Sequence, residues 1–156
     1  MLRDASGPGT SSTTASHTVA ERVFVDTSIW VYSVDRAEPV KRERARAALA
    51  PRQDAHITVS SQVLTEFYTV VTRKLASPVS VAQAEQMVDR LSQLPVVSVD
   101  ADLVLGAIQG SRAWDISLWD ALIIRAAEVA GCAVVLSEDL ADGATYGSVR
   151  VSNPLA

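Results

Sequence analysis

Arg22-Val23-Phe24-Val25-Asp26-Thr27-Ser28-Ile29-Trp30-Val31-Tyr32 is the stretch from which the fold can be predicted. The run from Arg22 to Val25 is rich in β-branched and aromatic side chains, which is typical of a buried strand. It ends at Asp26, and Thr27 and Ser28 then open a predicted helix. A short buried strand that leads straight into a helix indicates a parallel sheet covered by helices.

The same alternation continues to the end of the chain. Further strands are predicted over residues 56–59, 96–99, 133–136 and 149–151. Helices are predicted over residues 38–49, 60–74, 80–91, 100–108 and 117–130, where apolar residues recur at helical spacing. Short strands alternating with helices predict the α/β class, with helices on both faces of a parallel sheet.

The chain has 156 residues, of which 48% are hydrophobic, enough for the core of one domain. Residues 1–20 are mostly small and polar and are predicted to be a flexible Ser/Thr-rich leader, so the domain is assigned to residues 21–156. No apolar run approaches the roughly 20 residues that span a bilayer, so we expect no membrane segment and a cytoplasmic location.

The charged and metal-binding residue types exclude several classes of function. A net charge of −4 argues against a protein that holds nucleic acid by bulk positive charge. Cys132 is the only cysteine, which excludes disulfides and cysteine zinc sites and favours a buried thiol in a reducing compartment. His17 and His56 are isolated, so a histidine-centred zinc site or catalytic triad has little support.

The helix predicted over residues 117–130 carries Asp120 on a side shared with Ile124 and Ala127. Burying an ionised carboxylate without a partner is costly, which suggests a metal ion, a cation or hydrogen-bond donors. Ser117 with an acid three residues later also fits a capping box, in which Asp120 would only satisfy free amides. Both interpretations stay open for this helix taken alone.

Four acids are expected at one edge of the sheet. Asp26 and Asp139 follow predicted strands, and the helices that carry Glu66 and Asp120 begin at or near the same edge. Ligands of such sheets bind beyond the carboxyl ends of the strands. Each acid has a plainer interpretation: Asp26 as a helix cap, Glu66 as a solvated edge residue, and Asp139 as ordinary loop polarity beside Glu138 and Asp142.

Clustered carboxylates repel one another unless they are protonated or share a cation. Hard divalent ions prefer oxygen ligands, and Mg²⁺ typically binds one or two carboxylates together with water and substrate phosphate. Such an ion can activate a water and offset charge on a phosphodiester, while Glu66 or Asp139 could take the proton of the water. The pattern therefore favours phosphodiester hydrolysis.

The motifs around these acids resemble the PIN-domain ribonucleases, and more closely the VapC toxins of toxin–antitoxin pairs. The likeness covers roughly residues 22 to 156, and each motif alone is short, whereas four in order are fairly specific. It rests on Val25-Asp26-Thr27-Ser28-Ile29-Trp30, Ser60-Ser61-Gln62-Val63-Leu64-Thr65-Glu66-Phe67, Leu118-Trp119-Asp120-Ala121-Leu122-Ile123, Leu136-Ser137-Glu138-Asp139-Leu140 and the ending Gly147-Ser148-Val149-Arg150-Val151-Ser152-Asn153-Pro154.

This resemblance implies a three-layer α/β/α sandwich with a mostly parallel sheet and Mg²⁺- or Mn²⁺-dependent endonucleolytic cleavage of RNA. It implies that Asp26 and Asp120 are the principal metal-site acids and that Glu66 and Asp139 complete the catalytic pocket. A hydroxyl of Thr27 or Ser28 would support the metal or its water. The implied partners are a second copy of the chain, forming a homodimer, and a small VapB-type antitoxin that covers the pocket.

Three features depart from the family pattern. The leader over residues 1–20 is longer than usual, so the natural start may lie downstream, and Leu155 replaces an aromatic residue often found after Asn-Pro. Glu138 and Asp142 flank Asp139, which leaves the identity of the fourth acid open among the three.

Two further sets of residues have both a functional and a structural interpretation. Basic residues could line a path for RNA phosphates, or could simply form a solvated helix face; they are Lys41, Arg42, Arg44, Arg46, Arg73 and Lys74. Trp30, Trp114 and Trp119 could stack on bases, although packing in the core or in a dimer is the commoner role.

Two other functions compete with RNA cleavage. One is a receiver-like phosphoacceptor domain, although its paired acids after the first strand and its lysine after the last are missing. The other is a PIN-like binding protein that has lost activity, against which the presence of all four acids counts.

Overall fold

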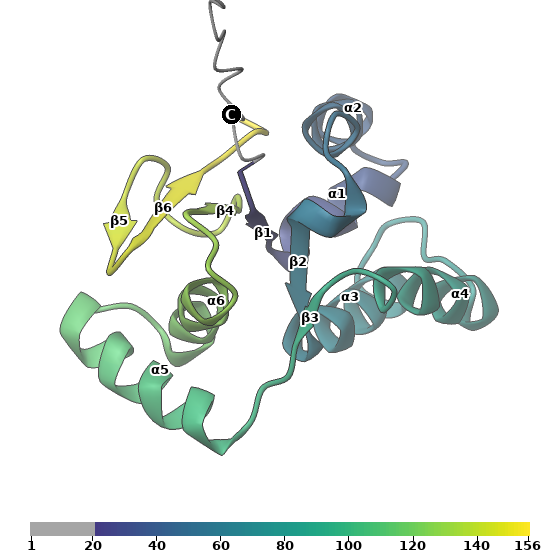
Figure 1. Ribbon diagram of the computed structural model, residues 1–156. Helices are drawn as coiled ribbons and strands as arrows, with labels where there is room; N and C mark the ends of the chain where they lie inside the picture. Colours follow the sequence, from purple (N-terminus) through teal and green to yellow (C-terminus); the bar gives the residue numbers. More distant parts are fainter. Residues whose placement is uncertain (1–20) are drawn as a thin grey trace, which may run out of the picture.

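The computed structural model describes residues 21–156, so the expected leader over residues 1–20 lies outside the described part of the chain. A mixed sheet lies in the middle, with helices on either side (Figure 1). The elements, in chain order, are β1 (Val23–Val25), α1 (Thr27–Val34), α2 (Pro39–Leu49), a 3₁₀ turn (Asp54–His56), β2 (Ile57–Ser60), α3 (Ser61–Arg73), α4 (Val81–Leu91), β3 (Val96–Val97), α5 (Ala101–Trp114), α6 (Leu118–Val129), β4 (Val134–Leu136), β5 (Thr145–Tyr146) and β6 (Val149–Ser152).

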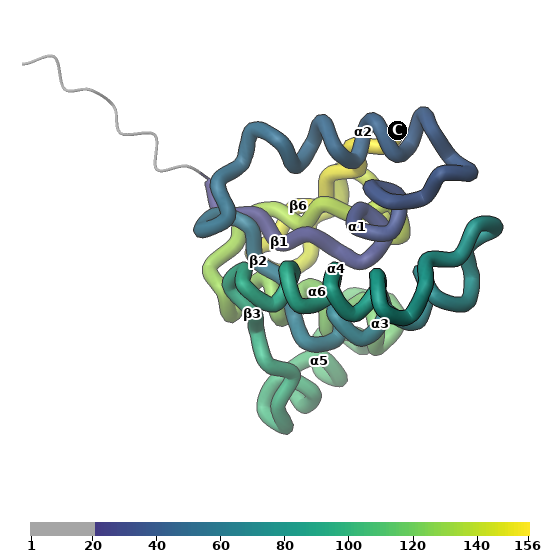
Figure 2. The backbone as a smooth tube through the Cα atoms, turned by 90° about the vertical axis from the view of Figure 1, so that its right-hand side faces the viewer, coloured from purple at the N-terminus to yellow at the C-terminus, as the bar shows by residue number. Residues whose placement is uncertain are grey.

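The six strands are ordered β3-β2-β1-β4-β6-β5, and only the pairing of β5 with β6 is antiparallel. Helices α1 and α2 lie on one side of the sheet and α5 and α6 on the other, as two perpendicular views show (Figures 1 and 2). The predicted three-layer α/β/α sandwich with a mostly parallel sheet is therefore confirmed.

Alternate residues of the central strands supply the two sides of the core, as the pleat of a strand requires. Phe24 of β1 and Val135 of β4 pack with α5 and α6. Val23 and Val25 pack on the opposite side with Ile29 of α1 and Ala45 of α2. Because both faces of β1 are covered, the strand reads as an unbroken apolar run.

Several elements differ from their predicted bounds, and the largest difference is in α5, which extends to Trp114 and not only to residue 108. His56 closes the 3₁₀ turn instead of opening β2. Strand β3 ends at Val97 instead of residue 99, because the Val99 amide donates to the hydroxyl of Ser61 at 3.0 Å instead of joining the ladder. Strand β5 was not predicted, since Thr145 and Tyr146 form too short a run to show an alternating pattern.

Three helices that start near the carboxyl edge of the sheet begin at a polar cap. Asp26, Ser60 and Ser117 accept hydrogen bonds from amides in the first turns of α1, α3 and α6. Asp26 directly follows β1, and Ser60 is the last residue of β2. The chain therefore brings capped helix starts to the same edge at which acids were expected. Within residues 21–156, no helix has the length and apolar character needed to cross a membrane.

Gly147 in the β5–β6 turn is expected to tolerate no side chain. Its φ is +57°, and an added Cβ would lie 2.7 Å from Oε2 of Glu128. Glu128 is held by Arg125 at 2.9 Å and by the Ser148 hydroxyl at 3.1 Å, so its carboxylate has little freedom to move. We expect Gly147→Ala to lower the free energy of unfolding by about 2 kcal/mol, as measured by urea denaturation.

Gly143 provides the matched control for this substitution. Its φ is +78°, but no atom lies within 4 Å of the position that a Cβ would occupy. Gly143→Ala should therefore show only the backbone penalty, about 1 kcal/mol. If both variants lose the same free energy of unfolding, the close contact with Glu128 does not add to the cost of Gly147→Ala.

Candidate functional site

Asp26 lies where β1 ends and α1 begins, and its residue is only 4% exposed. Its amide donates to the Leu136 carbonyl at 2.9 Å, which extends the pairing of β1 with β4 by one residue. Oδ1 accepts from the Thr27 amide at 2.7 Å, and Oδ2 accepts from the Ser137 hydroxyl at 2.7 Å. The interpretation of Asp26 as a helix cap is therefore correct, but a cap alone does not account for its surroundings.

The pKa of Asp26 is raised from 3.8 to about 7. Removal of the carboxylate from water is the main cause, and it outweighs the hydrogen bonds from Ser137 and Thr27, which lower the pKa. The charges of Asp139 and Glu66 raise it further. Asp26 therefore lies within electrostatic range of two of the acids that the sequence analysis grouped with it.

Glu66 on α3 is joined to both neighbouring elements by hydrogen bonds. The Thr27 hydroxyl donates to Oε2 of Glu66 at 2.9 Å, while the amide of the same residue holds Asp26. Gln62, one turn earlier on α3, donates through Nε2 to Oε1 of Glu66 at 3.0 Å and to the Trp119 carbonyl at 3.3 Å. Glu66 is half-buried and takes part in this network, so it is not a solvated edge residue.

Asp120 lies in the first turn of α6 and is half-buried. The Ser117 hydroxyl accepts from the Asp120 amide at 3.1 Å, which is one half of a capping box. The other half is missing, because no hydrogen bond or ion pair within residues 21–156 reaches the Asp120 carboxylate. Its side chain is therefore not engaged in capping and stays free to bind a ligand.

Asp139 is the acid of its loop that lies with the others. Its pKa is raised by partial burial and by the charges of Asp120, Glu138 and Glu66. Asp142 instead accepts from the Asn153 amide at 2.9 Å, which fixes the C-terminal turn. Glu138 pairs with Lys41 at 2.7 Å. Glu138 and Asp142 are thus engaged by other groups, whereas Asp139 interacts electrostatically with Asp120 and Glu66.

Ser137 and Gln62 connect these acids, and the sequence analysis gave neither a role. The fully buried Ser137 hydroxyl donates to Asp26 and accepts from the Asp139 amide at 3.1 Å, so it ties the first acid to the fourth. Gln62 ties Glu66 to the start of α6. The i to i+4 spacing of Gln62 and Glu66 was a usable signal, whereas the contact of Ser137 depends on strand pairing.

Ser137→Ala is expected to lower the free energy of unfolding by about 2 kcal/mol. The substitution leaves Oδ2 of the buried Asp26 without its donor and leaves the Asp139 and Leu140 amides without their acceptor. Urea denaturation at pH 7 measures the loss. Ser111→Ala is the control, because the Ser111 hydroxyl only bonds back to the Ile108 carbonyl of its own helix, and a loss as large in that variant would contradict the role given to Ser137.

The donor set of this site suits a hard divalent ion in chemical type. It offers carboxylate oxygens, and the side-chain oxygen of Gln62 is buried beside Glu66 without a hydrogen-bond partner in the described part of the chain. Within residues 21–156, no three ligand side chains are close enough to hold an ion by themselves. Mg²⁺ needs only one or two carboxylates and keeps its waters. In donor type, the residues therefore fit an ion that takes two carboxylates and keeps its waters.

The hydroxyls expected to support a metal are engaged with protein groups. The Thr27 hydroxyl donates to Glu66, and the Ser28 hydroxyl accepts from the Glu138 amide at 3.1 Å. Both hydroxyls therefore help to position acids of this edge.

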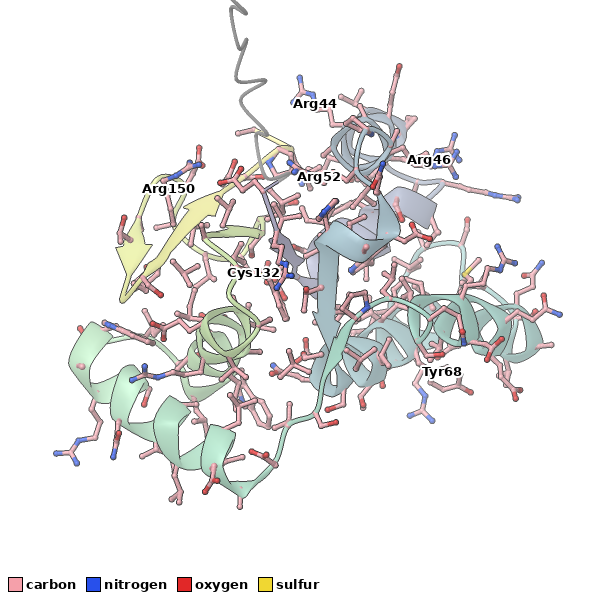
Figure 3. The ribbon with its side chains drawn as sticks, viewed as in Figure 1. Arg44, Arg46, Arg52, Tyr68, Cys132 and Arg150 are labelled. Atoms are coloured by element: carbon pink, nitrogen blue, oxygen red, sulfur yellow. The ribbon has the colours of Figure 1, made fainter. Side chains whose placement is uncertain are left out.

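The basic side chains do not form one continuous path. Lys41 reaches the loop that carries Asp139 through Glu138. Arg44 and Arg46 project from different sides of α2 (Figure 3), where they donate to the carbonyls of Leu155 and Ser33. Arg73 and Lys74 lie exposed at the end of α3, about two turns beyond Glu66.

The aromatic and thiol side chains divide between core and surface. Trp30 and Trp114 are half-buried and pack against the core, with the Trp30 ring donating to the Val25 carbonyl at 3.2 Å. Trp119 is 64% exposed beside Asp120. Cys132, between α6 and β4, is a buried free thiol, as expected (Figure 3).

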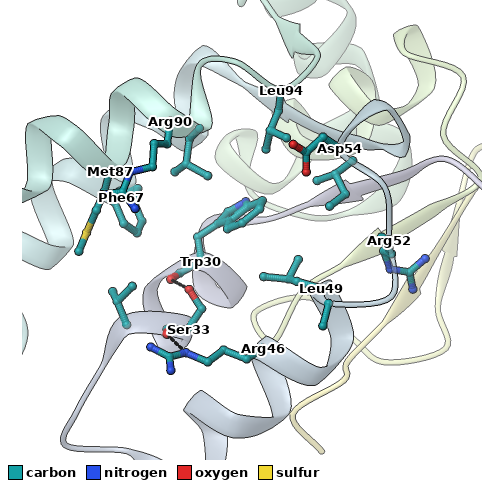
Figure 4. A pocket seen from close by; sticks show the side chains of 14 residues that line it. Trp30, Ser33, Arg46, Leu49, Arg52, Asp54, Phe67, Met87, Arg90 and Leu94 are labelled. Atoms are coloured by element: carbon teal, nitrogen blue, oxygen red, sulfur yellow. Dashed lines mark hydrogen bonds between the residues drawn. The ribbon is translucent and has the colours of Figure 1, made fainter.

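A groove separate from the acids lies between α1, α2 and α4, with a volume of about 580 Å³. Figure 4 shows Trp30 and Phe67 within it and the arginines Arg46, Arg52 and Arg90 around it. The lining thus combines apolar side chains with three arginines and Asp54. The sequence analysis did not predict it, because its lining comes from elements that are far apart in the chain.

The chain is thus a mostly parallel α/β sandwich with acids at the carboxyl edge of its sheet, the edge at which such sheets bind their ligands. Residues 23–141 match the model of the PIN domain family, and the chain belongs to that family. This membership confirms the resemblance drawn from the motifs and excludes the receiver-like alternative. No curated protein matches the sequence.

Solved structures similar to the chain include toxins and toxin–antitoxin complexes. VapC20 of Mycobacterium tuberculosis, described as a sarcin–ricin loop cleaving toxin, is 25% identical over 82% of this chain and 98% of that chain, with a TM-score of 0.62. A chain of FitAB bound to a DNA fragment is 19% identical, over 86% of this chain and 96% of that chain, with a TM-score of 0.67. DNA-bound VapBC from Salmonella typhimurium is 18% identical over 86% and 98%, with a TM-score of 0.58.

Proposed function

We propose that the chain is a metal-dependent endoribonuclease and the toxin of a VapBC-type pair. One observation carries this proposal: hydrogen bonds through Thr27, Gln62 and Ser137 tie Asp26, Glu66, the start of α6 and the loop of Asp139 into one network. The similarity to VapC20, which is described as a sarcin–ricin loop cleaving toxin, supports the choice of reaction.

Asp26 and Asp120 are proposed to hold Mg²⁺ or Mn²⁺, because Asp26 is buried at the sheet edge and the Asp120 carboxylate has no partner among residues 21–156. Such an ion supplies a charge that polarises a phosphodiester and lowers the pKa of water. Glu66 and Asp139 complete the catalytic pocket and accept protons. Thr27, Gln62 and Ser137 keep the acids in place, so little reorganisation is needed when RNA binds.

The test is cleavage of mixed cellular RNA by the purified chain, free of antitoxin, with Mg²⁺, with Mn²⁺ and with a chelator. We expect cleavage that needs the metal and that falls at least a hundredfold in Asp120→Asn. Asp142→Asn is the control, because Asp142 lies in the same loop as Asp139 but its carboxylate accepts from the Asn153 amide. Cleavage by Asp120→Asn at the wild-type rate would remove the proposed site, and no cleavage by the wild-type chain would favour a PIN-like binding protein.

The proposed partner is a small VapB-type antitoxin. Several similar structures are toxin–antitoxin complexes, and the groove between α1, α2 and α4 offers apolar and cationic side chains to a partner segment. Co-expression with the product of a short neighbouring reading frame should give one chromatographic peak without RNA cleavage. Separate migration and unchanged cleavage would contradict this partner.

We propose that the protein forms a homodimer and acts in the cytoplasm, where cellular RNA is available as a substrate. Exposed apolar side chains on α5 and α6 support association of two copies, namely Leu105, Ile108 and Trp119. Light scattering should give twice the chain mass, and a monomer at micromolar concentration would contradict the dimer.

A further inference from the structure

Lys41 lies at the edge of the acidic site although it comes from the opposite end of the sequence. Its ammonium is 2.7 Å from Oε1 of Glu138, and Glu138 directly precedes Asp139. The charge of Glu138 contributes to the raised pKa of Asp139, which places this ion pair within electrostatic range of the site.

The ammonium of Lys41 is held in place by an aromatic residue as well as by Glu138. It lies 4.6 Å from the centre of the Tyr32 ring and donates to the Tyr32 hydroxyl at 3.4 Å. The Tyr32 contacts do not depend on Glu138, so the ammonium has a second anchor if the ion pair opens. This arrangement presents a positioned cation to the approach of an anion.

The ion pair is partly exposed to solvent, so breaking it costs little free energy. The side chains of Lys41 and Glu138 are 33% and 26% exposed, and pairs of this exposure contribute little net stability. Oε2 of Glu138 is buried and has no hydrogen-bond partner among the described residues, so only one oxygen of this carboxylate is paired there. A phosphate of bound RNA could replace Glu138 as the partner of Lys41 at small cost.

We propose that Lys41 binds a phosphate of the RNA substrate next to the acidic site and that Glu138 competes with RNA for it. This inference rests on the proposed function, because it names a substrate contact of the same site. Lys41 contributes affinity without base specificity, as phosphate contacts do. Glu138 acts as a built-in competitor that weakens the binding of RNA.

A purely structural role for the pair makes a different prediction. If the ion pair only fastened α2 to the loop of Asp139, removing either partner would break the same contact, and both variants would change RNA binding in the same direction. If Lys41 binds phosphate and Glu138 competes, the two substitutions change affinity in opposite directions. The sign of the effect therefore distinguishes the two roles.

The experiment measures binding of a labelled total tRNA pool by the full chain, in an Asp120→Asn background that keeps the RNA intact. We expect Lys41→Gln to weaken binding about fivefold and to reduce the slope of log K against log salt by about one. Glu138→Gln should tighten binding about threefold. The double variant should bind RNA no more tightly than Lys41→Gln alone, because Glu138 affects RNA binding only by competing for Lys41.

Two control variants account for changes in charge alone. Arg46→Gln removes a cation from the same helix, about 140° round from Lys41, where the guanidinium donates to the Ser33 carbonyl. Glu43→Gln removes an exposed acid of α2. Both should change affinity by less than twofold. Changes of the same sign in Lys41→Gln and Glu138→Gln, or a full gain from Glu138→Gln without Lys41, would overturn the proposal.

The binding assay tests the role of Lys41, and the cleavage assay tests the proposed function, so the two proposals can be contradicted independently. If Lys41→Gln and Glu138→Gln change RNA affinity in opposite directions but the wild-type chain does not cleave RNA, the proposed function is contradicted and the role of Lys41 is supported. If the wild-type chain cleaves RNA only with metal but both variants change RNA affinity in the same direction, the proposed function is supported and the role of Lys41 is contradicted.

Discussion

Asp26→Asn is expected to abolish RNA cleavage, by at least a thousandfold, and at the same time to make the protein more stable. The carboxylate is buried and carries a pKa of about 7, so at pH 8 the folded protein holds an unfavourable charge. Asparagine keeps an oxygen that can accept from the Thr27 amide, but it removes the charge. We expect the free energy of unfolding to rise by about 2 kcal/mol at pH 8 without added metal.

The measurements for this prediction are RNA cleavage with Mg²⁺ and urea denaturation with a chelator. Asp120→Asn is the comparison, because its carboxylate is half-buried and makes no hydrogen bond within the described residues. That variant should lose cleavage with less than about 0.5 kcal/mol of change in stability. A less stable Asp26→Asn protein would show that the Ser137 contact needs the carboxylate itself.

The position of the acids could be predicted from the sequence because it follows from topology. Asp26 comes directly after a buried strand, and Asp120 comes in the first turn of a helix, so both could be assigned to the carboxyl edge of a parallel sheet. The pleat and the helix period are local properties of the chain. They are visible in the order of residues, and the structure agrees with them.

The contacts between side chains could not be predicted in the same way. Ser137 reaches Asp26 because β4 pairs with β1 in one particular register, with Val25 opposite Leu136. Asp142 and Asp139 are both acids of one loop, and only the turn that brings Asn153 back to Asp142 separates their roles. Such contacts join residues far apart in the chain, and no local pattern encodes them.

The groove shows the same limit at a larger scale. Phe67 of α3, Met87 of α4 and Leu49 of α2 each belong to an ordinary apolar stripe. The sequence indicates that these side chains turn inward, but not that the helices leave space between them. How three helices meet depends on crossing angles and side-chain volumes, which the pattern of apolar residues does not determine.

The stability of the protein should fall as the pH rises from about 4 to about 7 and should recover when Mg²⁺ is added. Asp26 has a pKa of 3.8 in an unfolded chain and about 7 in the folded protein, so between these values the folded state binds more protons. Stability then decreases with pH, by up to about 4 kcal/mol for this group. Asp139 adds a change of the same sign, because its pKa is also raised.

The measurement is urea denaturation between pH 4.5 and pH 8, with a chelator and with 10 mM Mg²⁺, for wild type and Asp26→Asn. The difference between the two proteins isolates Asp26 from other groups that titrate. Because the metal binds the deprotonated folded state, Mg²⁺ should stabilise wild type more at pH 8 than at pH 5, by about 2 to 3 kcal/mol at saturating concentration. A difference between the proteins that does not vary with pH would mean that Asp26 is ionised throughout, and an absence of any Mg²⁺ effect at pH 8 would remove Asp26 from the proposed metal site.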